Sequence, residues 1–273
     1  MVELKTVYVI TGANRGIGLC MVQLLLSRPQ TVVVGTVRSE DTRAQLLSGT
    51  ASVVLGAGSK LVSVLIDYSA HPEASEVENL VSAALLEASV KHVDVLVANA
   101  GYTNKTGSVL ETTPAEMREL YEVNTIGPLV MFQGLCGLLT QGRYEQGRDG
   151  VGKYVLISSS IGSIGMMEPM PGGAYGPSKA AANWITKAVH MQFGDGIGAA
   201  GEGKKNRVVG VSVHPGWVKT SMGEVVAQSW GVPEGHGPNL SAEESARNVV
   251  DLVDRAEELG GKFVMEGGKE LLW

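Results

Sequence analysis

The chain has 273 residues, of which 44% are hydrophobic and 18% charged, a composition that excludes a disordered or low-complexity protein. Acidic residues outnumber basic ones by 28 to 22, and this net charge of −6 argues against nucleic acid as a partner. The cysteines, Cys20 and Cys136, and the five histidines lack metal-ligand spacing, so no metal site is predicted. Without an internal boundary, residues 1–273 are predicted to form one domain.

The start of the chain and one uncharged stretch bear on location. Residues Met1–Ile10 carry Glu3 and Lys5 and lead into an apolar strand, without the pattern of a secretory signal. Val123–Gly142 has no charged residue, but polar side chains interrupt it. That content is typical of a buried helix rather than a membrane span. We therefore expect a cytoplasmic protein with no membrane partner.

Apolar, β-branched runs of strand length recur along the chain. In chain order they are Thr6–Ile10, Thr31–Val37, Leu61–Ile66, Val93–Ala98, Tyr154–Ser158, Val208–His214 and Lys262–Met265. The runs are continuously apolar, and helix-compatible segments separate them, which is typical of a parallel sheet covered on both faces. The predicted fold class is α/β, with a doubly wound parallel sheet of about seven strands and helices on both faces.

Two helix starts and two loops can be placed more closely. Thr113 and Ser241 each precede a glutamate in capping-box spacing, and Pro114 stands at the first helical position. Gln141–Lys153 and Gly194–Asn206 are rich in glycine and charge, so both are predicted to be surface loops.

A glycine-rich turn, Thr11–Gly18, lies between the first strand and the helical run Leu19–Leu26. Such a turn lets backbone N–H groups and the positive end of a helix approach a pyrophosphate. Its TGxxxGxG spacing resembles that of the short-chain dehydrogenases/reductases, which implies a Rossmann-like fold and a nicotinamide cofactor. The predicted cofactor-binding residues of the turn are Gly12, Asn14, Arg15, Gly16, Ile17 and Gly18.

Further motifs similar to those of this family follow in the expected order from Val7 to Met265. They are Ala98–Gly101, with alanine at the first asparagine of NNAG, then Asn124, Ile157–Ser160, Tyr175–Lys179 (YxxxK) and Pro215–Gly216. The resemblance implies further cofactor contacts from Asn99, Ala100, Gly101, Tyr175, Lys179, Pro215, Gly216, Val218 and Thr220. Within the family, the chain most resembles carbonyl reductases, including fungal ketoreductases of the norsolorinic-acid type.

The end of the second strand bears on the choice of cofactor. In dinucleotide folds an acid there favours the ribose 2′-hydroxyl, whereas a nearby arginine accommodates a 2′-phosphate. Here Arg38 follows the strand with no acid before Glu40, and Arg15 adds a second guanidinium. NADP(H) is therefore predicted, the alternative being that both arginines are merely solvated. By resemblance, Asp67 contacts the adenine amine, unless it only closes a turn.

Tyr175 and Lys179 share one face if both lie on the predicted helix after the fifth strand. A neighbouring ammonium favours the phenolate and draws the pKa of a tyrosine down from about 10. By resemblance, Tyr175 protonates a carbonyl oxygen while hydride arrives from the nicotinamide, and Lys179 also holds the nicotinamide ribose. Asn124 would hold a water that connects Lys179 to solvent.

Two serines compete for the role of orienting the substrate oxygen. The ISS motif selects Ser159, whereas counting back from Tyr175 by the usual family interval selects Ser163. Ser159 is the preferred residue, and it requires that Gly165–Gly173 be an insertion. A serine hydrolase is disfavoured because the sequence has no GxSxG motif.

A small-molecule carbonyl substrate is expected over the carboxyl ends of the strands, under a lid in about residues 217–240. Methionine and tryptophan residues suit a bulky apolar or aromatic substrate, although they could simply pack a lid. They are Met166, Met167, Met170, Trp217, Met222 and Trp230. The sequence leaves two alternatives open, an NAD-dependent alcohol dehydrogenase and a non-catalytic NADP(H)-binding redox sensor. A homodimer or homotetramer is expected from the uncharged helix and from the family.

Overall fold

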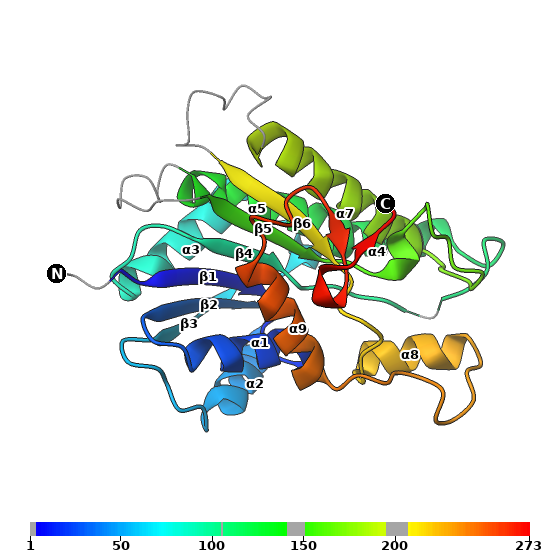
Figure 1. Ribbon diagram of the computed structural model, residues 1–273, viewed down its shortest axis with the longest axis horizontal. Helices are drawn as coiled ribbons and strands as arrows, with labels where there is room; N and C mark the ends of the chain where they lie inside the picture. The colour runs from blue at the N-terminus through cyan, green and yellow to red at the C-terminus, as the bar shows by residue number, and fades with distance from the viewer. Residues whose placement is uncertain (1–3, 105, 141–150, 195–206) are drawn as a thin grey trace.

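The computed structural model describes residues 4–104, 106–140, 151–194 and 207–273. Within these residues the strands form one eight-stranded sheet in the order β3-β2-β1-β4-β5-β6-β7-β8, parallel except for the final pair (Figure 1). The strands are β1 Thr6–Thr11, β2 Thr31–Val37, β3 Lys60–Leu65, β4 Val95–Ala98, β5 Gly152–Ile157, β6 Val208–Val213, β7 Phe263–Val264 and β8 Glu270–Leu271. The sheet crosses over between β3 and β4, because β4 returns to pair with β1.

The predicted α/β fold is confirmed, and all seven predicted runs are strands with small differences at their ends. The eighth strand was not predicted, because a pair as short as Glu270–Leu271 leaves no periodic signal. Part of one predicted loop is wrong, since Gly152 and Lys153 begin β5 by pairing with β6. Val151, also in that predicted loop, is buried, whereas residues 141–150 and nearly all of Gly194–Asn206 lie outside the described residues.

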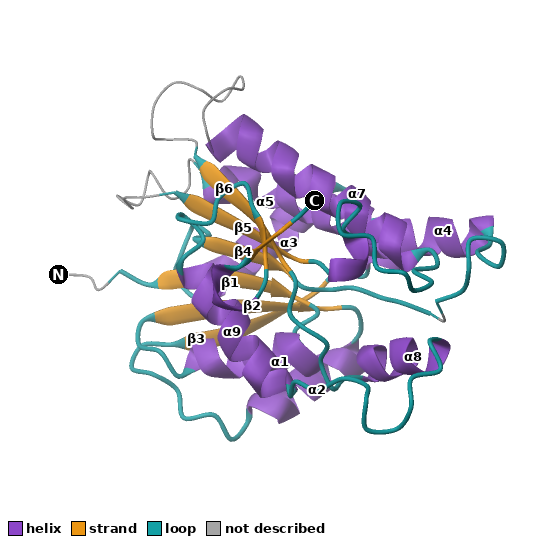
Figure 2. Cartoon of the chain, turned by 45° about the vertical axis from the view of Figure 1, so that its right-hand side comes forward, coloured by secondary structure: helices purple, strands orange, loops and turns teal. Residues whose placement is uncertain are grey.

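Helices cover both faces of the sheet (Figure 2). One face carries α1 Gly16–Leu26, α2 Glu40–Thr50 and α9 Ala242–Asp254, and the other carries α3 Ala74–Glu87, α5 Gly127–Leu139 and α7 Tyr175–Val189. Two shorter helices, α4 Pro114–Tyr121 and α8 Ser221–Ser229, lie beyond the carboxyl ends of the strands. This arrangement brings loops and helix starts from both halves of the chain to one edge of the sheet.

Alternating strand residues supply two apolar cores. Tyr8 and Ile10 of β1 pack with α1 and α9, whereas Val7 and Val9 pack on the opposite face with α3 and α5. All four are at most 5% exposed, and burying one such side chain stabilises the fold by about 1.5–3 kcal/mol. The continuous apolar runs thus reflect a sheet buried on both sides.

The predicted caps are confirmed, and the uncharged stretch is mostly buried, apart from residues such as the 40% exposed Ile126, but it is not one regular helix. Thr113 and Ser241 each form the reciprocal bonds of a capping box. The stretch begins with a π-helical turn, Glu122–Ile126, before α5, and its last residues lie outside the described part. Within the described residues, no helix is long and apolar enough to cross a membrane.

Candidate active site

A cavity of about 1460 Å³ opens beside the glycine-rich turn, larger than the ~300–1,000 Å³ of a drug-sized ligand site. Of the predicted cofactor residues, the following line it: Gly12, Asn14, Arg15, Gly16, Ile17, Gly18, Arg38, Asp67, Asn99, Ala100, Gly101 and Thr220. Tyr175, Lys179, Pro215, Gly216 and Val218 lie outside this lining. Sequence reasoning missed several lining residues, including Thr42, Gln45, Tyr68, Ser69, Tyr102, Met117, Lys219 and Ser221. Tyr68, Ser69 and Tyr102 follow a strand end closely in sequence, which was an available signal, whereas Met117 lies on α4 and had none.

Two glycines of the turn after β1, Gly12 and Gly18, have no room for a side chain. A Cβ on Gly12, whose φ is +65°, would lie 2.9 Å from the Cα of Ala100. A Cβ on Gly18 would overlap the Gly12 carbonyl oxygen and lie 2.6 Å from Asn99 Nδ2. Asn99 Nδ2 also donates to the Thr11 carbonyl at 2.8 Å, so the asparagine ties the loop after β4 to the turn.

The start of α1 is open toward this cavity. Arg15 is the N-cap residue of α1, but its side chain makes no capping hydrogen bond. The side chain therefore leaves the N–H groups of the first turn uncapped. Free N–H groups and the helix dipole together favour an anion there. The Arg15 guanidinium instead reaches the start of α8, where Nη1 donates to Ser221 Oγ at 3.0 Å. The residues at this end therefore fit a bound pyrophosphate.

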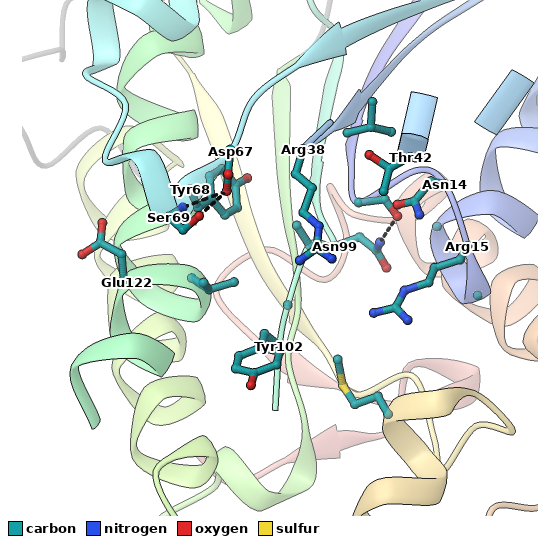
Figure 3. A pocket seen from close by; sticks show the side chains of 18 of the residues that line it. Asn14, Arg15, Arg38, Thr42, Asp67, Tyr68, Ser69, Asn99, Tyr102 and Glu122 are labelled. Atoms are coloured by element: carbon teal, nitrogen blue, oxygen red, sulfur yellow. Dashed lines mark hydrogen bonds between the residues drawn. The ribbon is translucent and has the colours of Figure 1, made fainter. Parts of the chain in front are cut away.

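Arg38 extends from the end of β2 into the cavity, between Asp67 on one side and Asn14 and Thr42 on the other (Figure 3). Within the described residues, its guanidinium forms no hydrogen bond or ion pair. It is exposed and lines the cavity wall. The geometry therefore leaves one unpaired cation at the place where a 2′-phosphate is predicted.

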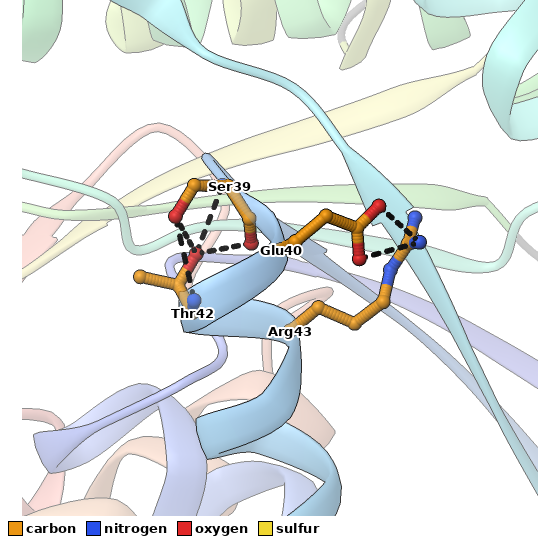
Figure 4. A network of polar contacts seen from close by, with 4 residues as sticks. All are labelled: Ser39, Glu40, Thr42 and Arg43. Atoms are coloured by element: carbon orange, nitrogen blue, oxygen red, sulfur yellow. Dashed lines mark hydrogen bonds and ion pairs between the residues drawn. The ribbon is translucent and has the colours of Figure 1, made fainter.

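The nearest acid in sequence, Glu40, is held away from that place (Figure 4). Its carboxylate accepts from Arg43 Nη1 at 2.8 and 3.0 Å. On the opposite side of the helix start, Ser39 and Thr42 form a capping box that fixes the first turn of α2. Glu40 is thus engaged within its own helix.

Acidic groups lie at the opposite wall. Asp67 Oδ1 accepts from the Ser69 backbone N–H at 3.0 Å and from Ser69 Oγ at 2.7 Å, so it does close a turn. It also lines the cavity, together with Glu122, which pairs with His71 at 2.8 Å. The cavity therefore has a basic wall near Arg15 and Arg38 and an acidic wall near Asp67, a distribution that fits the phosphates and the adenine amine of a dinucleotide.

Tyr175 begins α7 and is buried with only 7% of its surface exposed. Burial raises the pKa of Tyr175 to about 12, although the neighbouring Ser159 hydroxyl partly opposes that rise. The expected shift toward neutrality is absent, because desolvation outweighs any effect of the nearby ammonium. The phenol is therefore protonated at neutral pH.

Lys179 lies one turn further along α7, with its Nζ 5.7 Å from the centre of the Tyr175 ring. Nζ donates to the carbonyl of Ile157 at 2.9 Å, which fixes the ammonium at the end of β5. Burial lowers the pKa of Lys179 to about 8. A Cβ on Gly101 would lie 3.3 Å from this Nζ, so the glycine keeps the space next to the ammonium clear.

Asn124 is fully buried and joins two elements. Its Oδ1 accepts from the Tyr102 N–H at 2.8 Å, while Nδ2 donates to the Tyr102 carbonyl at 2.8 Å and to Ser178 Oγ at 3.0 Å. The π-helical turn presents the side chain in this position. Oδ1 also borders the space at Gly101, since a Cβ there would lie 3.4 Å away. Asn124 thus faces the same space as Lys179.

The two candidate serines have different partners. Ser159 lies next to Tyr175, close enough to lower the pKa of its phenol, and its Oγ accepts from the Ile161 N–H at 3.3 Å. Ser163 Oγ donates to the Leu272 carbonyl at 2.6 Å and accepts from the Met166 N–H at 3.0 Å. The structure therefore brings Ser159, rather than Ser163, to Tyr175.

The segment after β6 shapes the other edge of the site. Gly216 has a φ of +86°, and Pro215 accepts from Ser245 Oγ at 2.7 Å. Val218 is buried and bridges to Leu240, whereas Thr220 caps α8 and lines the cavity. Of these predicted residues, Thr220 has the most direct access to a bound molecule.

The predicted substrate region divides into two groups. Met222 lines the cavity, and Trp217 and Trp230 form a ring pair with centroids 5.8 Å apart. Met166, Met167 and Met170 are exposed. Among the described residues, no group of acidic, histidine or cysteine side chains could hold a metal ion.

Comparison with known proteins places the chain among oxidoreductases. A family model described as short chain dehydrogenase matches residues 6–229. A short-chain dehydrogenase of Neurospora crassa is 34% identical, covering 98% of each chain, and a norsolorinic acid ketoreductase of Dothistroma septosporum is 31% identical, covering 98% of this chain and 93% of the relative. An NADPH-bound carbonyl reductase from chicken fatty liver is 25% identical, with a TM-score of 0.76 and complete coverage of both chains.

Proposed function

The chain belongs to the short-chain dehydrogenase/reductase family, and we propose that it uses NADPH to reduce a bulky apolar or aromatic ketone or aldehyde to an alcohol. The observation that supports this most is the nearness of Ser159 and of the Lys179 ammonium to Tyr175. These groups lie beside a cavity that fits a dinucleotide.

In this proposal Tyr175 is the proton donor. Its raised pKa keeps the phenol protonated at neutral pH, so the proton is available to the substrate oxygen as the carbonyl is reduced. Ser159 orients that oxygen through its hydroxyl. When bound, NADPH supplies the hydride that the carbonyl carbon accepts. The carbonyl thereby gains a hydride at carbon and a proton at oxygen, and Tyr175 is left as phenolate.

Tyr175 then regains a proton from the direction of Lys179. The ammonium of Lys179 stabilises the phenolate by its charge, and it shares the space beside Gly101 with the Asn124 side chain. We assign Asn124 the role of holding a water in this path. Its side chain also fixes the loop after β4 against α7 through Tyr102 and Ser178.

NADPH rather than NADH is the proposed cofactor because of the charges around the end of β2. Arg38 lines the cavity without a partner among the described residues, whereas Glu40 is paired with Arg43. A ribose 2′-phosphate would therefore meet a free guanidinium. The NADPH bound by the chicken carbonyl reductase is consistent with this choice.

The proposed substrate class follows from apolar side chains near Tyr175, chiefly Met117 and Met222, and agrees with the ketoreductase relatives. We further propose that the protein is cytoplasmic and assembles as a homodimer or homotetramer. Light scattering at working concentration tests the assembly, and a monomer would contradict it.

The deciding experiment follows the nicotinamide absorbance of NADPH, and separately of NADH, with aromatic and aliphatic ketones, quinones and aldehydes. Rapid oxidation of NADPH with an aromatic ketone, and slower oxidation of NADH, is the expected result. Faster turnover of alcohols with NAD would favour an alcohol dehydrogenase instead. Tight binding of NADPH without turnover of any compound would favour a redox sensor.

A further inference from the structure

Two methionine side chains stand between the nucleotide cavity and Tyr175. Met117 of α4 and Met222 of α8 both line the cavity. Both also pack against a buried cluster formed by Leu120, Ala174 and Tyr175. Because Tyr175 is only 7% exposed, a carbonyl compound that reaches its hydroxyl has to pass close to these side chains.

The backbone that carries Met222 is tied at the start of α8. Ser221 Oγ accepts from Arg15 Nη1 of the glycine-rich turn at 3.0 Å. Thr220 caps the helix and accepts from the Gly223 N–H at 3.2 Å. Gly223 itself is buried, and a Cβ there would lie 3.2 Å from Pro238 Cγ and overlap the Val218 carbonyl oxygen. The start of the helix thus has little room to shift.

The other end of α8 is tied to two further loops. Ser229 Oγ accepts from the Thr106 N–H at 3.2 Å, and Trp230 Nε1 donates to the Pro171 carbonyl at 2.9 Å. Those two loops are joined to each other by the Gly173 N–H and the Gly107 carbonyl at 3.1 Å. With both ends of α8 held, the simplest way to make room beside Tyr175 is to move side chains.

We propose that Met117 and Met222 determine substrate specificity by forming an adjustable apolar wall, which admits flat, uncharged aromatic ketones of different sizes by changing rotamers while α8 stays in place. The inference rests on the proposed function. Methionine is suited to the role, because it is unbranched, has several rotatable bonds and makes favourable sulfur contacts with aromatic rings.

The other side chains packed around Tyr175 bear on which charge a bound substrate can carry. Leu120, Ala174 and the adjoining Ile161 are apolar. A carboxylate placed next to the ketone would lose its hydration against these side chains without gaining a partner from them. Neutral ketones are therefore expected to bind better than their carboxylated analogues.

The experiment replaces each flexible methionine by a stiffer side chain of similar volume. Met222→Ile and Met117→Ile introduce a β-branched side chain whose χ1 is restricted in a helix, whereas Met222→Ala opens space. Met191→Ile is the matched control, because Met191 is a 40% exposed methionine on the π-helical turn after α7. The probes are aryl methyl ketones with one, two or three fused rings, and a carboxylated analogue of each.

Two readouts are compared across the series, kcat/KM with NADPH and the dissociation constant of each ketone for the NADP⁺-loaded protein by calorimetry. In both isoleucine variants, kcat/KM and affinity for the largest ketone are expected to fall about tenfold relative to those for the smallest. A difference of this size is typical of a small steric change in an apolar pocket. Met222→Ala is expected to shift the ratio toward the largest ketone. Met191→Ile is expected to keep the wild-type ratio.

Unchanged ratios in all three site variants would overturn the inference, as would tighter binding of the carboxylated ketones or no binding of any ketone. Failure of the proposed function has a different signature. In that case ketones bind, and the variants change their ranking, but the wild-type protein oxidises no NADPH with any of them.

Discussion

The two ends of the site are built in different ways. At the glycine-rich turn, backbone contacts define the shape, since side chains on Gly12 or Gly18 would collide with Ala100, Asn99 or the turn itself. Beneath α8, the shape depends on side chains such as Met117 and Met222. Backbone contacts allow one arrangement and one kind of ligand, whereas flexible side chains allow several. The difference explains how a cofactor can be fixed while the substrate varies.

Tyr175→Phe tests the chemistry at the junction of these two regions and has the largest expected effect. Removal of the proton donor should lower kcat by about 10²–10⁴-fold, while NADPH affinity stays within about threefold because Tyr175 lies outside the cavity lining. Steady-state rates and a fluorescence titration of NADPH measure both quantities.

The control is Tyr8→Phe, which removes the hydroxyl of another buried tyrosine, one that lies near Arg28 and does not line the cavity. It should leave kcat unchanged. Equal losses in both variants would mean that Tyr175 has a structural role only.

Lys179→Met tests the buried charge in the same place. Because the pKa of Lys179 falls from 10.5 to about 8 on folding, the unfolded chain binds more protons between these values. Wild-type stability should therefore rise, relative to the variant, as pH increases from 8 to about 10.5, by up to about 3 kcal/mol. Below pH 8 the difference should be constant. Urea unfolding of both proteins across this range measures it.

If the difference in unfolding free energy between wild type and Lys179→Met stays the same from pH 8 to 10.5, Lys179 keeps its ordinary pKa and is hydrated in solution. The same comparison separates Lys179 from Tyr175, whose pKa is raised. Tyr175 lowers the stability of both proteins above pH 10, so to a first approximation it cancels from their difference.

Gly18→Ala tests whether backbone contacts really define the cofactor end. The added Cβ would overlap the Gly12 carbonyl, and overpacking of this kind costs about 1–3 kcal/mol. NADPH affinity should fall by up to about a hundredfold. Gly137→Ala is the control, because a Cβ at this α5 position would have nothing within 4 Å. It should leave affinity unchanged and stabilise the helix slightly.

The cofactor end could be predicted from the sequence for the same reason. Glycines at positions that forbid a Cβ leave a pattern in the chain, and continuous apolar runs such as Thr31–Val37 mark strands that are buried on both faces. The capping boxes at Thr113 and Ser241 are equally local. Each of these signals lies within a few consecutive residues.

The substrate end depends on contacts that are distant in sequence and carry no such pattern. The choice between Ser159 and Ser163 required the position of Leu272, whose carbonyl holds Ser163. Nothing near Met117 in the sequence indicated that it meets Met222 at one cluster. The high pKa of Tyr175 was missed because burial, which the YxxxK motif does not reveal, outweighs the nearby charge.

Arg38→Ala sharpens the comparison at the one place where a side chain, rather than the backbone, is proposed to select the cofactor. Removing an exposed charge-assisted contact should lower the affinity for NADPH about tenfold and leave the affinity for NADH within about twofold of the wild-type value. Arg255→Ala is the control, since it removes the same charge from an exposed pair with Asp251 on α9. Calorimetric titration of each protein with both nucleotides gives the dissociation constants.

Added salt should narrow the wild-type preference for NADPH, because Arg38 is exposed. If Arg38→Ala weakens NADH as much as NADPH, the arginine does not read the 2′-phosphate, and the preference has to come from the turn itself through Arg15.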